Sequence, residues 1–147
     1  MVLQTDGLTQ LVNRLGYEHY LARLHVPATI LMFDVDRFKD VNDCHGHLMG
    51  DACLRTIAGC IRRAYGNYGT CFRIGGDEFC VILTRRNAQY NTMTEIFQHL
   101  MDAARAENPV LPMVSVGCSH FNPSTDELAE SLARADARMY QNKEAHR

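Results

Sequence analysis

The chain has 147 residues, of which 46% are hydrophobic and 22% are charged, and its formal net charge at pH 7 is −2. This composition is ordinary for a globular protein of a length that buries a core without disulfides or structural metals, and the slightly acidic balance argues against a charge-driven nucleic-acid or membrane binder. The longest apolar run, residues 28–33, is too short for direct membrane insertion, and no secretory signal precedes it. We therefore expect one cytoplasmic domain over residues 1–147, excised as the C-terminal module of a larger protein that is either cytoplasmic throughout or anchored in a membrane.

Hydrophobic periodicity predicts the first half of the fold. A first amphipathic helix, ended by Pro27, is expected from the apolar positions Leu8, Leu11, Leu15, Tyr20, Leu21 and Leu24. The run ATILMFDVD, residues 28–36, is typical of a buried strand that carries carboxylates at its exit. Helices are expected over residues 38–43 and 50–65.

The second half begins with a predicted hairpin, in which the runs TCFRI and FCVIL flank a Gly-Gly-Asp-Glu turn. A helix over residues 91–105 and a strand over residues 113–119 follow. Residues 124–127 have the spacing of a capping box, which would open a last helix with apolar positions at Leu128, Leu132, Ala135 and Met139. The predicted fold class is α/β (α+β), with a central mixed, largely antiparallel sheet of about five strands flanked by helices.

The six cysteines show no C-x-x-C spacing, and nearly all of them lie in apolar segments. We interpret them as small hydrophobic residues in a reducing compartment. A disulfide framework or a zinc site is the less favoured alternative.

Acidic residues are concentrated at two places that could meet. Asp34 and Asp36 end the buried strand, and Asp77 and Glu78 occupy the hairpin tip. If the strands are neighbours, these oxygens would converge in the open arrangement that suits Mg²⁺ or Mn²⁺ and substrate phosphates. The alternative is a tight Gly-Gly turn with solvated acids.

Four blocks resemble the GGDEF family of diguanylate cyclases. They are RIGGDEF at residues 73–79, DGLTQLVNR at 6–14, FDVDRFKDVNDCHGHLMGD at 33–51 and ADARMYQNK at 135–143. They occur in the family's order and spacing over nearly the whole chain. The resemblance implies a palm-like, nucleotide-cyclase-like fold and the condensation of two GTP molecules into cyclic di-GMP, with two Mg²⁺ or Mn²⁺ ions per active site.

The resemblance also implies roles for the acidic residues. Asp34, the main-chain carbonyl of Val35, and Asp77 would hold the metals. Asp77 would also help to deprotonate the attacking 3′-hydroxyl, and Glu78 would either assist the metal site or shape the turn. Asp36 is interpreted as structural.

Substrate contacts follow from the same resemblance. Asn42 and Asp51 match the guanine-reading positions, which favours GTP over ATP, and His47 falls near the nucleoside unless it is a capping or core histidine. The phosphate end of the site would be formed by the N–H groups of Arg37, Phe38 and Lys39, the close backbone approach at Gly75 and Gly76, and the side chains of Lys143 and Arg147. A solvated, basic helix end is the alternative for Lys143 and Arg147.

Two features depart from the family pattern. The R-x-x-D product-inhibition motif aligns with Gly66 and Gly69, so we expect little feedback inhibition through that site. The usual ending K-x-x-G-R-N reads K-E-A-H-R here. The implied partners are GTP, the cyclic di-GMP product, a second copy of the domain needed for catalysis, and an upstream sensory domain. A non-catalytic GTP-binding or protein-interaction domain, or another nucleotide cyclase, remains the alternative.

Overall fold

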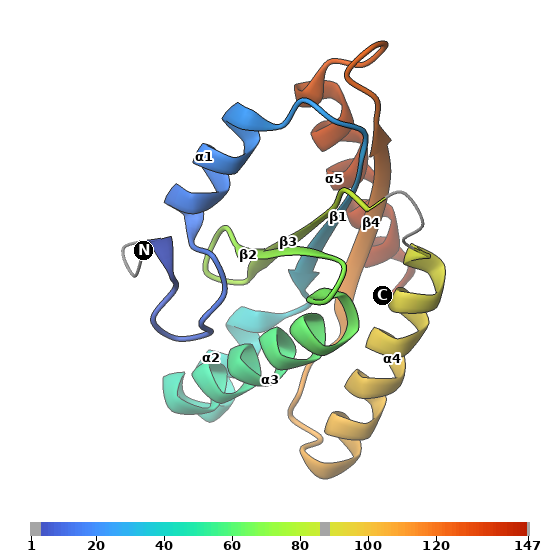
Figure 1. Cartoon of the computed structure of the whole chain (residues 1–147). Helices are drawn as coiled ribbons and strands as arrows, with labels where there is room; N and C mark the ends of the chain where they lie inside the picture. The colour runs from blue at the N-terminus through green and yellow to red at the C-terminus, as the bar shows by residue number, and fades with distance from the viewer. Residues whose placement is uncertain (1–3, 86–88, 147) are drawn as a thin grey trace.

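The computed structural model describes residues 4–85 and 89–146, which form four strands and five helices. In chain order they are α1 (Arg14–Arg23), β1 (Ala28–Val35), α2 (Phe38–His45), α3 (His47–Tyr65), β2 (Gly69–Arg73), β3 (Glu78–Leu83), α4 (Tyr90–Glu107), β4 (Val114–Phe121) and α5 (Leu128–Ala145). The strand order is β2-β3-β1-β4 (Figure 1). All three pairings are antiparallel, so the predicted class is confirmed, but these residues hold four strands rather than about five. Within the described residues, the expected mixed pairing is limited to one parallel bridge, between Val12 and Phe72.

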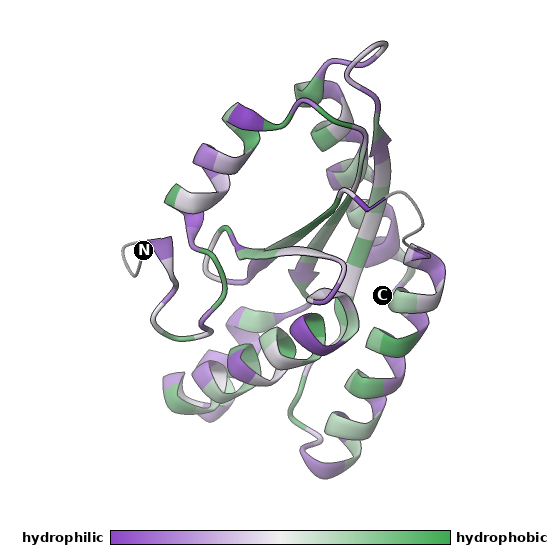
Figure 2. Cartoon of the chain, in the orientation of Figure 1, coloured by the Kyte–Doolittle hydropathy of each residue, from purple (hydrophilic) through white to green (hydrophobic). Residues whose placement is uncertain are grey.

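The two faces of the sheet carry separate apolar clusters because side chains alternate along a strand. On β1, Leu31, Phe33 and Val35 pack on the side of α3 and α4. Ile30 and Met32 pack on the opposite side, with residues of α1 and α5. Figure 2 shows hydrophobic central strands and helices along which hydrophobic and hydrophilic residues alternate. Strand β1 is therefore covered on both faces.

Two predicted helix starts are wrong. Helix α1 begins at Arg14, where the Asn13 side chain accepts a hydrogen bond from the N–H of Gly16, so Leu8 and Leu11 precede it in a packed loop. Helix α5 begins at Leu128, after an N-cap residue, Glu127, whose side chain makes no capping bond. The expected capping box is replaced by a turn in which Asp126 accepts from the N–H of Asn122 at 2.8 Å.

Small residues on β4 let helix α5 approach the sheet closely. Ser115, Gly117 and Ser119 alternate along the strand, and both serines are fully buried. The Ser119 hydroxyl donates to the Ser131 carbonyl at 2.6 Å, and a Cβ added at Gly117 would overlap the α5 backbone. The closeness of α5 matters because its last turns carry Lys143.

The six cysteines are all free thiols, and Cys44 is the exposed one. Burial raises the pKa of Cys71 and of Cys118 to about 11, which keeps these thiols protonated and inert. None of the helices in the described part of the chain combines the length and apolarity needed to span a bilayer.

The contact at Gly117 predicts a large effect of a small substitution. Gly117→Ala should lower the free energy of unfolding by about 3 kcal/mol, because its methyl group meets α5 backbone atoms that cannot rotate away. Gly59→Ala is the matched control, since an added Cβ there meets nothing within 4 Å inside helix α3, and it should change stability by less than about 1 kcal/mol in the stabilising direction. Urea unfolding of both variants measures the difference, and equal stabilities would contradict the close packing of α5.

Candidate functional site

The exit of β1 brings together the acidic residues that the sequence singles out. Asp34 lies opposite Glu78 on β3 and opposite Ser115 on β4, because β1 is flanked by both strands. The N–H of Val35 donates to the Asp77 carbonyl at 3.1 Å, which fixes the Gly-Gly-Asp-Glu turn beside the strand end. The conditional prediction that these strands are neighbours is therefore confirmed.

The electrostatics of this edge reflect crowded negative charge. Burial and the neighbouring Asp34 carboxylate raise the pKa of Asp77 above its ordinary value. Burial, Asp34 and Asp77 together do the same for the pKa of Glu78, although Glu78 is exposed. Carboxylates that resist ionisation near others of like charge are typical of functional sites.

Lys143 partly neutralises this cluster from helix α5. Its Nζ lies 2.8 Å from Asp34 Oδ2, and both side chains are shielded from solvent, at 30% and 16% exposure. The hydrogen bond to Asp34 raises the pKa of Lys143, so the ammonium is held in its charged form. The candidate phosphate ligand thus contacts a candidate metal ligand directly.

Asp36 belongs to a different network. The carboxylate is buried; Ser115 Oγ donates to its Oδ1 at 2.6 Å, and His146 Nδ1 lies 2.5 Å from its Oδ2. The N–H of Asp36 donates to the Met113 carbonyl at 2.9 Å. These contacts connect the end of β1 to β4 and to the end of α5.

Asn42 and Asp51, the candidate guanine-reading residues, come from two helices that meet at a glycine. Helix α2 ends and α3 begins around Gly46, which has a φ of +88°. Both side chains are partly exposed. A Cβ added at Gly50 would overlap the Asn42 amide oxygen, so Gly50 leaves the space in which that amide lies.

The remaining candidates lie at helix starts and the hairpin turn. Arg37 is the left-handed N-cap of α2, with a φ of +54°, and the first-turn N–H groups of Phe38 and Lys39 have no acceptor within the helix. His47 is exposed at the start of α3, so it is not a core histidine. Gly75 and Gly76 lie in the turn before Asp77, and an added Cβ at Gly76 would meet nothing within 4 Å. Arg147 lies outside the described residues.

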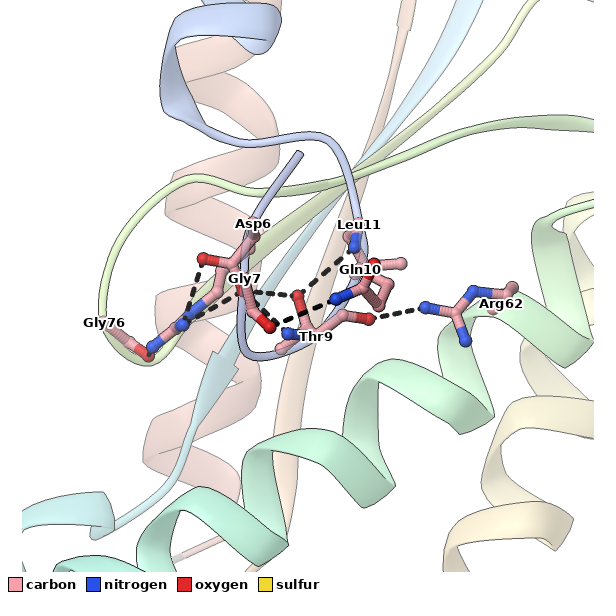
Figure 3. Close-up of polar contacts among 8 residues, drawn as sticks. Asp6, Gly7, Thr9, Gln10, Leu11, Arg62 and Gly76 are labelled. Carbon is pink, nitrogen blue, oxygen red and sulfur yellow. Dashed lines mark hydrogen bonds and ion pairs between the residues drawn. The ribbon is translucent and has the colours of Figure 1, made fainter. Parts of the chain in front are cut away.

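The N-terminal loop clamps the hairpin, a role that sequence reasoning missed. Asp6 accepts from the N–H and the hydroxyl of Thr9, and both of its oxygens accept from Arg73 at 3.2 Å. Arg73 also donates to the Gly76 carbonyl at 2.8 Å, and Arg62 reaches from α3 to the Thr9 carbonyl at 2.6 Å (Figure 3). The acidic turn is thereby tied to both the N-terminal loop and, through it, helix α3. The available signal was the pair of motifs DGLT and R-x-G-G, whose charged members are complementary.

The donor atoms suit a hard divalent cation, although no group of three or more His, Cys, Asp and Glu side chains in residues 4–85 and 89–146 forms a metal-binding cluster. Two adjacent carboxylates, Asp34 and Asp77, offer oxygen ligands whose mutual repulsion a cation would relieve. Mg²⁺ commonly uses one or two carboxylates and completes its shell with water and phosphate oxygens. The residues present therefore fit that ion.

A cavity of about 790 Å³ adjoins the phosphate end of the candidate site. It is lined by the β1 exit, helix α2, the α4–β4 connection and the end of α5; its charged lining residues include Asp36, Arg37, Asp40 and Lys143. A second cavity, of about 470 Å³ between α1 and β2, contains none of the candidate residues.

A model of the family described as "Diguanylate cyclase, GGDEF domain" matches residues 3–147. The chain belongs to the GGDEF family. A protein of Streptomyces ambofaciens, "Uncharacterized 19.3 kDa protein in repSA 5'region", is 36% identical over 92% of this chain and 75% of its own length. The "Diguanylate cyclase DgcZ" of Escherichia coli strain K12 is 34% identical over 80% of this chain, and the match covers 41% of that protein.

The GGDEF fold is also confirmed by solved structures. The GGDEF domain of DgcB from Caulobacter crescentus, solved in complex with c-di-GMP, superposes with a TM-score of 0.82 at 28% identity, covering 98% of this chain and 92% of that one. This chain therefore has the GGDEF fold over nearly its whole length.

Gly66 and Gly69, which align with the R-x-x-D motif, lie just before β2 and at its first residue. A Cβ added at Gly69 would overlap the Ile82 carbonyl oxygen of the neighbouring strand, and one at Gly66 would lie 2.5 Å from the Arg62 carbonyl oxygen. Both glycines allow close backbone approaches that side chains would disturb.

The crowded carboxylates predict a pH-dependent stability effect. Because the pKa of Asp77 is raised in the folded state, the native protein loses stability as pH rises through the window just above the ordinary value of 3.8. Asp77→Asn removes this loss, so it should stabilise the domain at pH 7 by less than about 1 kcal/mol, given solvent screening, with the gain shrinking toward pH 4. Urea unfolding between pH 4 and 7 tests this against Asp102→Asn, an exposed acid on α4 that should give no such gain. A destabilised Asp77→Asn protein at pH 7 would contradict the repulsion.

Proposed function

We propose that this domain is a diguanylate cyclase that condenses two GTP molecules into cyclic di-GMP and releases two pyrophosphates. The observation that carries the proposal is the convergence of Asp34, Asp77 and Lys143 at one sheet edge. Carboxylates for a cation and an ammonium for phosphates are what nucleotidyl transfer needs at its reacting end. The match to DgcZ, which is named a diguanylate cyclase, supports the same activity.

Guanine recognition is assigned to Asn42 and Asp51. A carboxylate accepts from the guanine N1–H and exocyclic amine, whereas adenine offers an acceptor at N1. Asn42, placed beside Gly50, donates and accepts through its amide. GTP is therefore the proposed substrate and ATP is excluded by the unpaired polar groups it would leave.

The phosphates are assigned to the start of α2 and to Lys143. The N–H groups of Phe38 and Lys39, with that of Arg37 before them, offer donors at the positive end of the helix dipole. Lys143 exchanges Asp34 for a terminal phosphate when nucleotide binds. The carboxylates of Asp34 and Asp77 and the carbonyl of Val35 would hold Mg²⁺ or Mn²⁺, which when bound lowers the charge repulsion between the attacking and leaving oxygens.

Two copies of the domain are needed, because one chain supplies one GTP and one set of acids. Asp77 assists removal of the proton from the 3′-hydroxyl, and its raised pKa makes the carboxylate a stronger base. Glu78, exposed beside it, assists the same edge. The hydroxyl then attacks the α-phosphate of the GTP on the partner domain, and pyrophosphate leaves. The upstream sensory module proposed from the sequence would control how often two copies meet.

Product analysis tests the activity directly. The purified domain at high concentration with GTP and Mg²⁺ should form cyclic di-GMP at a rate that rises more steeply than linearly with protein concentration, and ATP should give no comparable turnover. Asp77→Ala should lower the rate by a factor on the order of 10³ or more without unfolding the domain, because a turn residue contributes little to the core. Asp102→Ala removes an equal charge from the exposed side of α4 and should retain activity.

The outcomes separate the proposed enzyme from its alternatives. A domain that binds GTP and dimerises but forms no new nucleotide would be a regulatory GGDEF domain. Comparable turnover of ATP would contradict the role of Asn42 and Asp51. An Asp77→Ala protein with unchanged turnover would remove that residue from the mechanism.

The missing R-x-x-D motif predicts weak product inhibition. Gly66 and Gly69 carry no side chain that could bind the guanine bases or phosphates of cyclic di-GMP, so added product should leave the initial rate nearly unchanged. Steady-state assays with added cyclic di-GMP, together with calorimetric titration, measure this. Tight product binding that is lost in Asn67→Ala or Tyr68→Ala, within the same turn, would contradict the prediction.

A further inference from the structure

His146 is three residues beyond Lys143, and it contacts the acidic end of β1 in the same way. Its Nδ1 lies 2.5 Å from Asp36 Oδ2, while Lys143 Nζ lies 2.8 Å from Asp34 Oδ2. Residues three apart share a face of a helix, and residues two apart share a face of a strand. The last turn of α5 is therefore joined to β1 by two parallel bridges.

The second bridge joins a partly exposed histidine to a buried carboxylate. The Asp36 side chain is 10% exposed and the His146 side chain is 24% exposed, and Ser115 beneath them is fully buried. Ser115 Oγ donates to the other oxygen of Asp36 at 2.6 Å and lies 3.3 Å from His146 Nδ1. Losing a hydrogen-bond donor costs more free energy at a buried carboxylate than at an exposed one. These hydrogen bonds therefore hold Asp36 and its partners firmly in place.

We propose that His146 is a positioning residue for the nucleotide's terminal phosphates, acting through the last turn of α5. By bonding to Asp36 it fixes that turn, and with it the ammonium of Lys143, at the edge of the cavity that Lys143 and Arg37 both line. Asn142 is held by the N–H of Val116 at 2.8 Å, so without His146 the residues that follow Asn142 would fray. The family's K-x-x-G-R-N ending gives glycine at this position, so the bridge is a feature of this chain.

The inference rests on the proposed function for its ligand, and nucleotides of different length test it without turnover. The probes are GMP and the α,β-methylene analogue of GTP, whose scissile bond is blocked. His146→Gly should lower the affinity for the triphosphate analogue about 5- to 20-fold and leave the affinity for GMP unchanged. This is the range expected when a hydrogen bond to a charged group no longer orders its partner. A purely structural loss of stability would affect both nucleotides alike.

Two further variants separate the hydrogen bond from backbone flexibility. His146→Asn keeps an N–H donor close to the Nδ1 position and should restore most of the triphosphate affinity. Ala145→Gly introduces the same flexibility into the same exposed turn and should leave both affinities at the wild-type value. Equal triphosphate affinity in His146→Gly and the wild type, or equal losses in His146→Gly and Ala145→Gly, would overturn the proposal.

A readout without nucleotide distinguishes this inference from the proposed function. Amide hydrogen exchange over residues 142–146 should be faster in His146→Gly than in Ala145→Gly or His146→Asn, because only the first loses the bond to Asp36. If the wild type binds neither probe, the proposed function is contradicted. The exchange comparison still tests whether His146 holds the end of α5 through Asp36. Identical exchange rates in all three variants would overturn the proposal that the His146–Asp36 bond holds the end of α5.

Discussion

Like charges held close together at the exit of β1 are the constraint on which the rest of the structure depends. Burial and the charge of Asp34 raise the pKa values of Asp77 and Glu78, and isolated side chains would move apart. They cannot do so because the backbone holds them: Asp34 is fixed in the central strand and the turn is bonded to Val35. Much of the surrounding structure keeps these carboxylates close together despite the repulsion between them.

Three parts of the chain hold these acidic residues together against their repulsion: the N-terminal loop, helix α5 and strand β4. The N-terminal loop ties the turn through Arg73, which bonds to both Asp6 and Gly76. Hydrogen bonds from Thr9 and Arg73 outweigh burial and lower the pKa of Asp6, whereas the pKa values of Asp77 and Glu78 are raised. Helix α5 supplies the compensating charge, and it reaches the acids because β4 presents Gly117 beneath it.

Sequence reasoning succeeded where the determinants are local. The strands and the hairpin were predicted because apolar runs and a Gly-Gly turn lie next to one another in the chain, and the extended motif indicated the family. It failed for Leu8 and Leu11, which have helical spacing but pack against the core from a loop. It also failed for the predicted capping box, because Asp126 accepts a hydrogen bond within a turn instead. The bond between Lys143 and Asp34 spans 109 positions, so no local pattern could specify it. The pairing of Arg73 with Asp6 was hidden for the same reason, although both residues lie within recognised motifs.

In the proposed mechanism, the positive charge of Lys143, which stabilises the nucleotide-free domain, is also the charge that the phosphates of GTP would require. Lys143 lowers the repulsion at Asp34 and Asp77 when no cation is present, and its own pKa is raised in return. A divalent cation at these carboxylates would compete with the ammonium for Asp34 Oδ2, and the released Lys143 would then be free to bind phosphate. Under the proposed function, cation and triphosphate binding would be linked, because each would remove the penalty that the other meets alone. In the proposed exchange, a second bridge from the same helical turn, at Asp36, would keep the helix end in place, so that Lys143 could change partner without leaving the site.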